Sequence, residues 1–207
     1  MNVIERLSSS RGERDNAADI ALAEDITLTR DVKAVRELVE HLADKNKRLA
    51  SDCIKTLYEI GEREPKLIAE YTDEFATLLT SKHQRLVWGG MCALDCCASV
   101  KPEEVHAHLA AILKAADGES VIARDHAITI LATLSAGKHA RECVPLMLDI
   151  IRTAPINQWP TYVEKAEPVA KGEDRDTLKK IVAHRLPEIR EHKSKTIRME
   201  KVLHRLP

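Results

Sequence analysis

Hydrophobic residues recur at helical spacing along this chain, and the pattern itself repeats every 37 residues. Three sets of apolar positions keep this step: Ile54, Met91 and Ile128; Leu57, Leu94 and Leu131; Ile60, Cys97 and Leu134. Arginine recurs with the same step at Arg11, Arg48 and Arg85, and the register slips by one residue from Tyr162 onward. A fixed period of this length is typical of a solenoid, in which each unit buries its apolar face against the next.

Within each repeat the apolar residues step by three or four along two segments, which predicts two helices per repeat. Gly61 ends one such segment, and Pro65 and Pro102 stand where a first helical turn tolerates proline. Asp44 and Ser81 are the expected N-caps. First helices are predicted at about 29–43, 65–80, 102–116, 138–154 and 173–191. Second helices are predicted at about 10–25, 46–61, 83–98, 119–135, 160–171 and 193–206.

These features resemble the HEAT and armadillo class of α-solenoids over residues 7–206. The shared features are a proline that opens the first helix, a turn with Asp or Ser, and an Arg-apolar step that opens the second helix. They are seen as Asp44 to Arg48-Leu49 and Ser81 to Arg85-Leu86, whereas the third copy has Ile122-Ala123 and the fourth opens with Trp159-Pro160. The resemblance implies an all-α, right-handed superhelix of about five hairpins, whose second helices line a concave binding face for proteins and sometimes nucleic acid. We expect one repeat domain over 1–207, with 173–207 as a basic capping repeat.

Composition supports a soluble helical protein and gives no sign of a membrane partner. Only 3% of the residues are aromatic and seven are glycine, while 44% are hydrophobic and 31% are charged. The first fifteen residues lack the apolar run of seven or more residues that a secretory leader needs, and no stretch approaches eighteen apolar residues. Its cysteine count is odd, five, and three of these cysteines crowd one predicted helix, which favours reduced thiols. We expect a cytoplasmic protein.

The expected concave face carries both signs of charge and one large aromatic side chain. Its residues are predicted from their phase in the repeat: Arg48, Asp52, Lys55, Arg85, Trp88, Cys92, Asp125 and His126. Such a mixed surface suits recognition of a protein or peptide, in which buried Trp and Arg are frequent anchors. A solvated face with i,i+4 pairs such as Arg48–Asp52 and Lys55–Glu59 is the alternative. Trp88 is expected either to pack between repeats or to stand in the groove, and Trp159 is expected to be structural.

Cysteine and histidine positions give little support to a metal centre. Cys92 and Cys96 share one helix face, but the matching positions of the neighbouring helices add only Glu59 as a ligand. His106 and His108, two residues apart, point about 200° apart on an unbroken helix. The metal-dependent hydroxylases built from HEAT-like repeats use His-Glu dipeptides, and this sequence has none. We therefore predict no metal and no cofactor.

No catalytic motif is evident, so the chain is predicted to be a non-enzymatic interaction or scaffold module. The HEAT-like alkylpurine DNA glycosylases use concave aromatic residues with Asp and Arg. Here Trp88 is followed at i+4 by Cys92 instead of a carboxylate, and Arg124 with Asp125 is a loose substitute.

Gly90 occupies the same position of the repeat as Cys53 and Ala127. A small residue is needed at this position.

The last part of the chain is basic and supplies the alternative function. From Arg175 to Pro207 there are ten basic and four acidic residues, although the whole chain carries a net charge of −1. Four lysines are candidate nucleic-acid contacts: Lys179, Lys180, Lys193 and Lys195. The alternative function is therefore binding of a nucleic-acid backbone, in which these lysines would contact phosphates. This alternative includes a degenerate binder of the HEAT-like DNA glycosylase type. A polar cap on the last repeat explains the same charges. The oligomeric state and the identity of the partner stay open.

Overall fold

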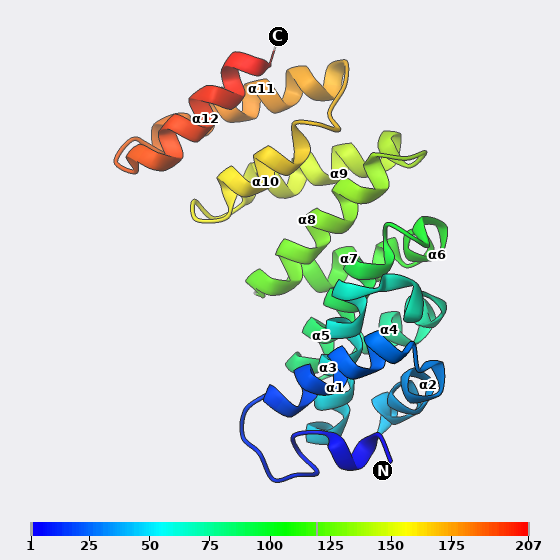
Figure 1. Ribbon diagram of the computed structural model, residues 1–207. Coiled ribbons are helices and arrows are strands. Elements are labelled where there is room, and N and C mark those ends of the chain that lie inside the picture. The colour runs from blue at the N-terminus through cyan, green and yellow to red at the C-terminus, as the bar shows by residue number, and fades with distance from the viewer. Residues whose placement is uncertain (1, 119, 207) are drawn as a thin grey trace. The chain divides into compact units, whose positions relative to one another are not determined.

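The computed structural model describes residues 2–118 and 120–206, and in these ranges the chain folds into helices and contains no strand (Figure 1). The α-helices are α1 (Ala17–Thr29), α2 (Val32–Glu40), α3 (Lys47–Arg63), α4 (Thr72–Leu78), α5 (Gln84–Cys97), α6 (Pro102–Ala107), α7 (Leu109–Ala116), α8 (Val121–Ser135), α9 (Ala140–Thr153), α10 (Trp159–Ala166), α11 (Glu173–Arg185) and α12 (Lys193–Arg205). The chain divides into two compact units, Met1–Ala127 and Ile128–Pro207. The all-α prediction is confirmed. The prediction of a single repeat domain capped by 173–207 stays a prediction.

The 37-residue period is visible in the helix boundaries. Helices α3, α5 and α8 begin at Lys47, Gln84 and Val121, and α10 begins one residue late at Trp159. All nine in-register apolar residues named above are at most 1% exposed. In the first unit, α1, α3 and α5 lie on one side, with α2 and α4 on the other (Figure 1). The second helices of successive repeats therefore pack against one another, as a solenoid requires.

The helix starts use different caps from those predicted. Asn46, not Asp44, caps α3, and its side chain accepts hydrogen bonds from the N–H groups of Arg48 and Leu49. Asp44 Oδ1 accepts a hydrogen bond from the Asn46 N–H at 2.7 Å, and Ser81 Oγ accepts one from the His83 N–H at 3.1 Å. Asp44 and Ser81 therefore fix the turn two residues before the N-cap position, where short polar side chains bond readily to the backbone.

Two predicted first helices are broken. The segment 65–80 consists of the 3-10 helices Pro65–Leu67 and Ala69–Tyr71 followed by α4, and the segment 102–116 is divided at His108 into α6 and α7. At each break the backbone turns to i→i−3 hydrogen bonds, such as His108 N–H to the Val105 carbonyl at 3.0 Å. Pro65 and Pro102 nevertheless begin their segments, as predicted.

The predicted helix at 10–25 is wrong, since α1 spans Ala17–Thr29. Two buried carboxylates hold the preceding segment in a turn: Asp19 accepts a hydrogen bond from the Ser8 N–H at 2.9 Å, and Asp52 accepts one from the Ser9 N–H at 2.7 Å. Gly12 adopts a φ of +72°, which glycine tolerates and a continuing helix does not. These bonds from side chains elsewhere in the chain outweigh the helical signal of the repeat.

Asp19 gives a pH-dependent prediction. Burial raises the pKa of its carboxyl group above the ordinary value of 3.8. As the pH rises, Asp19 therefore loses its proton at a lower pH in the unfolded chain than in the folded chain. The cost of ionising the buried carboxyl group lowers the free energy of unfolding at neutral pH. We expect the stability of Asp19→Asn relative to wild type to increase between pH 4 and pH 7, as measured by urea titration. A constant difference across this range would contradict the prediction.

In the second unit, Trp159 is fully buried at the start of α10, which confirms its structural role. The guanidinium group of Arg185 in α11 lies 5.0 Å from the centre of the Trp159 ring. The same group donates a hydrogen bond to the Ile151 carbonyl at 2.9 Å. Arg185 therefore ties α9, α10 and α11 together. Within the described ranges, no helix is long and apolar enough to cross a membrane.

Candidate functional site

An open cavity of about 420 Å³ lies on the first unit, along the second helices of successive repeats. Its lining comes from the segment before α1, from α3 and α5, and from the first turn of α8. The lining residues are Arg14, Asp15, Asn16, Ser51, Asp52, Ile54, Lys55, Tyr58, Arg85, Trp88, Gly89, Cys92 and Ile122. Five of the eight residues predicted for the concave face are among them: Asp52, Lys55, Arg85, Trp88 and Cys92. We call this surface the groove.

Part of the groove's charge is neutralised within the protein. Lys55 forms an ion pair with Glu59, and its ammonium group lies 4.5 Å from the centre of the Tyr58 ring. Burial disfavours the charged form of Glu59, but its hydrogen bonds from Lys55 and Arg63 outweigh this and lower its pKa. The expected i,i+4 pair Lys55–Glu59 is therefore present. Lys55 acts as a fixed part of the wall.

The second expected i,i+4 pair, Arg48–Asp52, does not form. Asp52 is buried and accepts a hydrogen bond from the Ser9 N–H, while the guanidinium group of Arg48 donates a hydrogen bond to the Glu13 carbonyl. Both residues therefore secure the segment before α1, which becomes one wall of the groove. The repeat pattern missed Arg14 and Asp15 in this wall because it predicted a helix there.

Of the five predicted residues that line the groove, Arg85 is the exposed one and Trp88 is the large aromatic side chain. Trp88 is half-buried and also borders a second cavity of about 400 Å³ that includes Ser81, Gln84 and Ser120. Its indole N–H is buried without an acceptor in the described part of the chain. Arg85 is exposed on the same helix, α5. A large aromatic side chain beside an unneutralised arginine is the composition of a binding hot spot.

His126 and Asp125, both half-buried on α8, do not line the cavity, and the exposed Arg48 does not either. His126 instead packs against the wall residue Cys92, with Nε2 3.0 Å from the cysteine Sγ. The other ring nitrogen, Nδ1, lies 2.8 Å from Oδ2 of Asp95. Sequence reasoning did not single out Asp95, which lies three residues after Cys92 on the same helix face.

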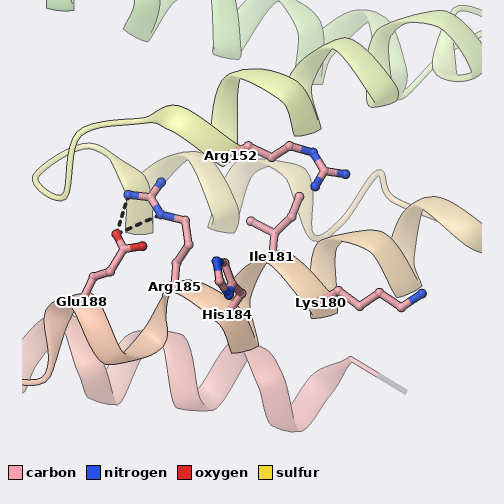
Figure 2. Close-up of a pocket in the computed structure, with 6 residues that line it drawn as sticks. All are labelled: Arg152, Lys180, Ile181, His184, Arg185 and Glu188. Atoms are coloured by element: carbon pink, nitrogen blue, oxygen red, sulfur yellow. Dashed lines mark hydrogen bonds and ion pairs between the residues drawn. The ribbon is translucent and has the colours of Figure 1, made fainter.

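The second unit has its own cavity, of about 440 Å³, lined by Arg152, Lys180, Ile181, His184, Arg185 and Glu188 (Figure 2). Lys180 is the only one of the four candidate lysines in this lining. Lys195 donates a hydrogen bond to Asn157 at 2.7 Å, Lys193 is exposed at the start of α12, and Lys179 is half-buried. The four lysines therefore do not gather around this cavity.

Arginines of the basic tail are largely neutralised. Arg198 forms two hydrogen bonds to Glu164, at 2.6 and 2.8 Å, and lowers the pKa of that carboxyl group. Arg205 pairs in the same way with Glu167, and Arg185 pairs with Glu188 (Figure 2). This arrangement matches a cap in which the last helices hold their neighbours through ion pairs.

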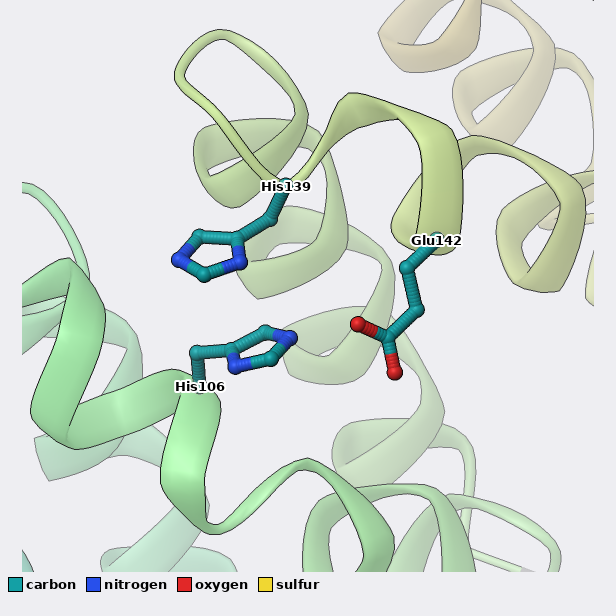
Figure 3. Close-up of side chains that lie close together, drawn as sticks. All are labelled: His106, His139 and Glu142. Carbon is teal, nitrogen blue, oxygen red and sulfur yellow. The ribbon is translucent and has the colours of Figure 1, made fainter.

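Among the described residues, no group of histidines and acidic residues that could hold a metal ion lies within a single unit. His108 lies at the break between α6 and α7, and its Nε2 is 2.7 Å from Asp73 Oδ1. His139 and Glu142 stand at the start of α9, and His106 stands on α6 (Figure 3). His106 belongs to the first unit and the other two residues to the second.

The fold matches solved repeat proteins over nearly its whole length. A computationally designed armadillo repeat protein for modular peptide recognition is 12% identical with a TM-score of 0.65, covering 99% of this chain and 98% of the other. A designed armadillo repeat protein in complex with the peptide (KR)4 is 12% identical with a TM-score of 0.63, covering 97% and 98%. An engineered protein is 14% identical with a TM-score of 0.64, covering 100% and 97%. No family model and no curated protein matches the sequence.

These matches show that the chain has the fold of an armadillo/HEAT-type α-solenoid. The resemblance drawn from the repeat pattern is therefore confirmed at the level of fold.

Proposed function

We propose that this protein is a non-enzymatic binding module that holds a protein or peptide segment in the groove of its first unit. The observation that carries the proposal is the convergence of Asp52, Lys55, Arg85, Trp88 and Cys92 on one open cavity. These residues come from two successive repeats, so a bound segment would cross both. Long surfaces of this kind are how repeat proteins bind extended chains.

The chemistry of the groove favours a peptide. Tyr58 and Trp88 offer aromatic area at the groove, which is typical of hot spots at interfaces. Arg85 offers an exposed guanidinium group for a carboxylate or a backbone carbonyl, while Lys55 is already paired. The similar designed armadillo proteins are described as recognising peptides, which supports the same use of the fold here.

Selection of peptides from a random library against the wild-type protein tests this proposal. Arg85 is exposed, so Arg85→Glu should preserve the fold while reversing the charge of the groove. We expect Arg85→Glu to weaken the selected peptides by about tenfold or more, and Trp88→Ala to do the same, as measured by titration calorimetry. The matched control is Lys180→Glu, an exposed charge reversal beside the cavity of the second unit.

Unchanged affinity for Arg85→Glu and Trp88→Ala would place binding elsewhere and overturn the proposal. A loss for Lys180→Glu alone would assign binding to the second unit instead.

Nucleic-acid binding through the basic end is the alternative, and no observation favours it. The arginines there face Glu164, Glu167 and Glu188 within the protein. Reversing the charges of Lys179, Lys180, Lys193 and Lys195 together is the test of this alternative. If these lysines hold phosphates, both the affinity for a DNA duplex and its salt dependence should fall in the variant.

A further inference from the structure

Cys92, His126 and Asp95 form a hydrogen-bonded chain at the wall of the groove. The sulfur of Cys92 lies 3.0 Å from Nε2 of His126, and Nδ1 of the same ring lies 2.8 Å from Oδ2 of Asp95. An ionised carboxylate only accepts hydrogen bonds, so Nδ1 carries a hydrogen and Nε2 is left to face the sulfur. The ring is therefore oriented to take the thiol proton, as a base does beside a nucleophilic cysteine.

Charge at this cluster favours the proton on the ring. Burial disfavours the imidazolium, but the hydrogen bonds to Asp95 and Cys92 and their negative charges outweigh it and raise the pKa of His126 to about 10. The other titratable groups close to the cluster are Tyr58 and Glu62 on α3 and Cys96 on α5. Lys55, the nearby cation of α3, is held by Glu59 and Tyr58. The proton that Nε2 takes from Cys92 is therefore held on the ring, and His126 then becomes the cation that faces the sulfur.

The other four cysteines lack this environment. Cys53, Cys97 and Cys143 are fully buried. Burial raises the pKa of the Cys97 thiol to about 12 and that of the Cys143 thiol to about 11. Burial also raises the thiol pKa of Cys96, whose sulfur faces the Tyr58 carbonyl at 3.9 Å. Among the described residues, Cys92 is the one cysteine that both borders the cavity and contacts an imidazole.

The surroundings of Cys92 suit exchange with a disulfide better than hydrolysis of an ester or amide. Cys92 lies within α5, where the neighbouring backbone N–H groups belong to the helix. Hydrolytic cysteine enzymes need free donors of that kind to hold the oxyanion of their intermediate. Thiol–disulfide exchange needs only a thiolate, an accessible sulfur and a leaving thiol. The cavity of about 420 Å³ has the size of a small-molecule site.

We propose that Cys92 is a reactive thiol that exchanges with small-molecule disulfides, with His126 as its base and Asp95 as a positioning residue. The thiol proton moves to His126 Nε2, and the thiolate attacks one sulfur of the disulfide RSSR. A bond forms between Cys92 Sγ and that sulfur while the old sulfur–sulfur bond breaks. The leaving RS⁻ takes the proton from His126, so that Cys92 is oxidised and one thiol, RSH, is released. This assignment does not depend on peptide binding.

Oxidised glutathione and iodoacetamide are the probes that test the proposal, with the modified cysteine located by peptide mass spectrometry. An ordinary thiol is only a few per cent ionised at pH 7, and a neighbouring imidazole that takes the thiol proton raises the reactive fraction, which gives about a tenfold gain after the offset of weaker nucleophilicity. We expect Cys92 to react about ten times faster than free cysteine-like thiols at pH 7. The rate should stay high as the pH falls toward 6.

Three variants test whether Cys92 reacts because His126 activates its thiol or only because its sulfur is accessible. His126→Gln should slow Cys92 by about tenfold at pH 7 and restore the pH profile of an ordinary thiol, while Asp95→Asn should slow it by a smaller factor. His184→Gln, an exposed histidine of the second unit, is the matched control and should change nothing. Should Cys92 of the wild type react no faster than free thiols, or His126→Gln react at the wild-type rate, the proposal is overturned. The wild-type measurement decides even where a variant fails to fold.

Discussion

Replacing Gly90 with valine is expected to destabilise the first unit by about 3 kcal/mol. A Cβ atom at this position would stand 2.8 Å from the backbone oxygen of Phe75 and 3.1 Å from the Cβ of Leu78. A carbonyl oxygen cannot turn away as a flexible side chain can, so α4 and α5 would have to separate. Valine adds two further methyl groups at this contact and gains too little helix propensity to compensate.

The two tryptophans allow this effect to be measured in the correct unit. Trp88 lies in the first unit and Trp159 in the second, so a Trp159→Phe background leaves Trp88 as the fluorescent reporter of unfolding in urea. Gly118→Val is the control, because a Cβ there would meet only the Ala115 oxygen at 3.5 Å, an ordinary contact. An unchanged unfolding midpoint for Gly90→Val would show that α4 and α5 are not closely packed.

The sequence indicated this contact because the repeat compares equivalent positions. Gly90 shares its phase with Cys53 and Ala127, which are both fully buried, and a small residue is required at all three. The same comparison predicted the starts of α3, α5 and α8 to within two residues. Helix packing that recurs in every repeat leaves a periodic signal, and this is why the periodic part of the fold was predictable.

Features that occur once in the chain were not predictable in this way. The segment before α1 is held by Asp19 and Asp52, and the break at His108 is accompanied by a contact with Asp73. Each depends on side chains that meet across the fold and have no equivalent one repeat further on. The predicted helix at 10–25 was wrong for this reason, since the repeat indicated a helix there but hydrogen bonds to Asp19 and Asp52 hold the segment in a turn.

The groove shows the same division. Repeat phase placed Trp88, Arg85 and Cys92 on one face, and the structure brings them to one cavity. Phase also placed His126 on that face, but it did not show that the ring of His126 reaches the sulfur of Cys92. The offset between neighbouring helices decides which side chains touch, and spacing along one chain does not contain that offset. Asp95 was missed because its role exists only through His126.

Arg185→Ala is expected to destabilise the second unit by about 3 kcal/mol, which is the second large effect. The side chain of Arg185 is 10% exposed, and it covers the ring of the buried Trp159. Alanine removes that packing and leaves the buried Ile151 carbonyl without the donor it now has at 2.9 Å. Each loss costs a sizeable part of the stability of a small domain.

Arg152→Ala separates this structural role from a simple loss of charge at the same cavity. Arg152 is exposed and lines the same cavity as Arg185 (Figure 2). It forms an exposed ion pair with Asp149, at 3.5 Å. We expect Arg152→Ala to change the stability by less than about 0.5 kcal/mol, since exposed ion pairs contribute little. Urea unfolding followed through Trp159 in a Trp88→Phe background measures both variants. Equal destabilisation by the two substitutions would mean that positive charge, and not the packing of Arg185 on Trp159, holds α11 to its neighbours.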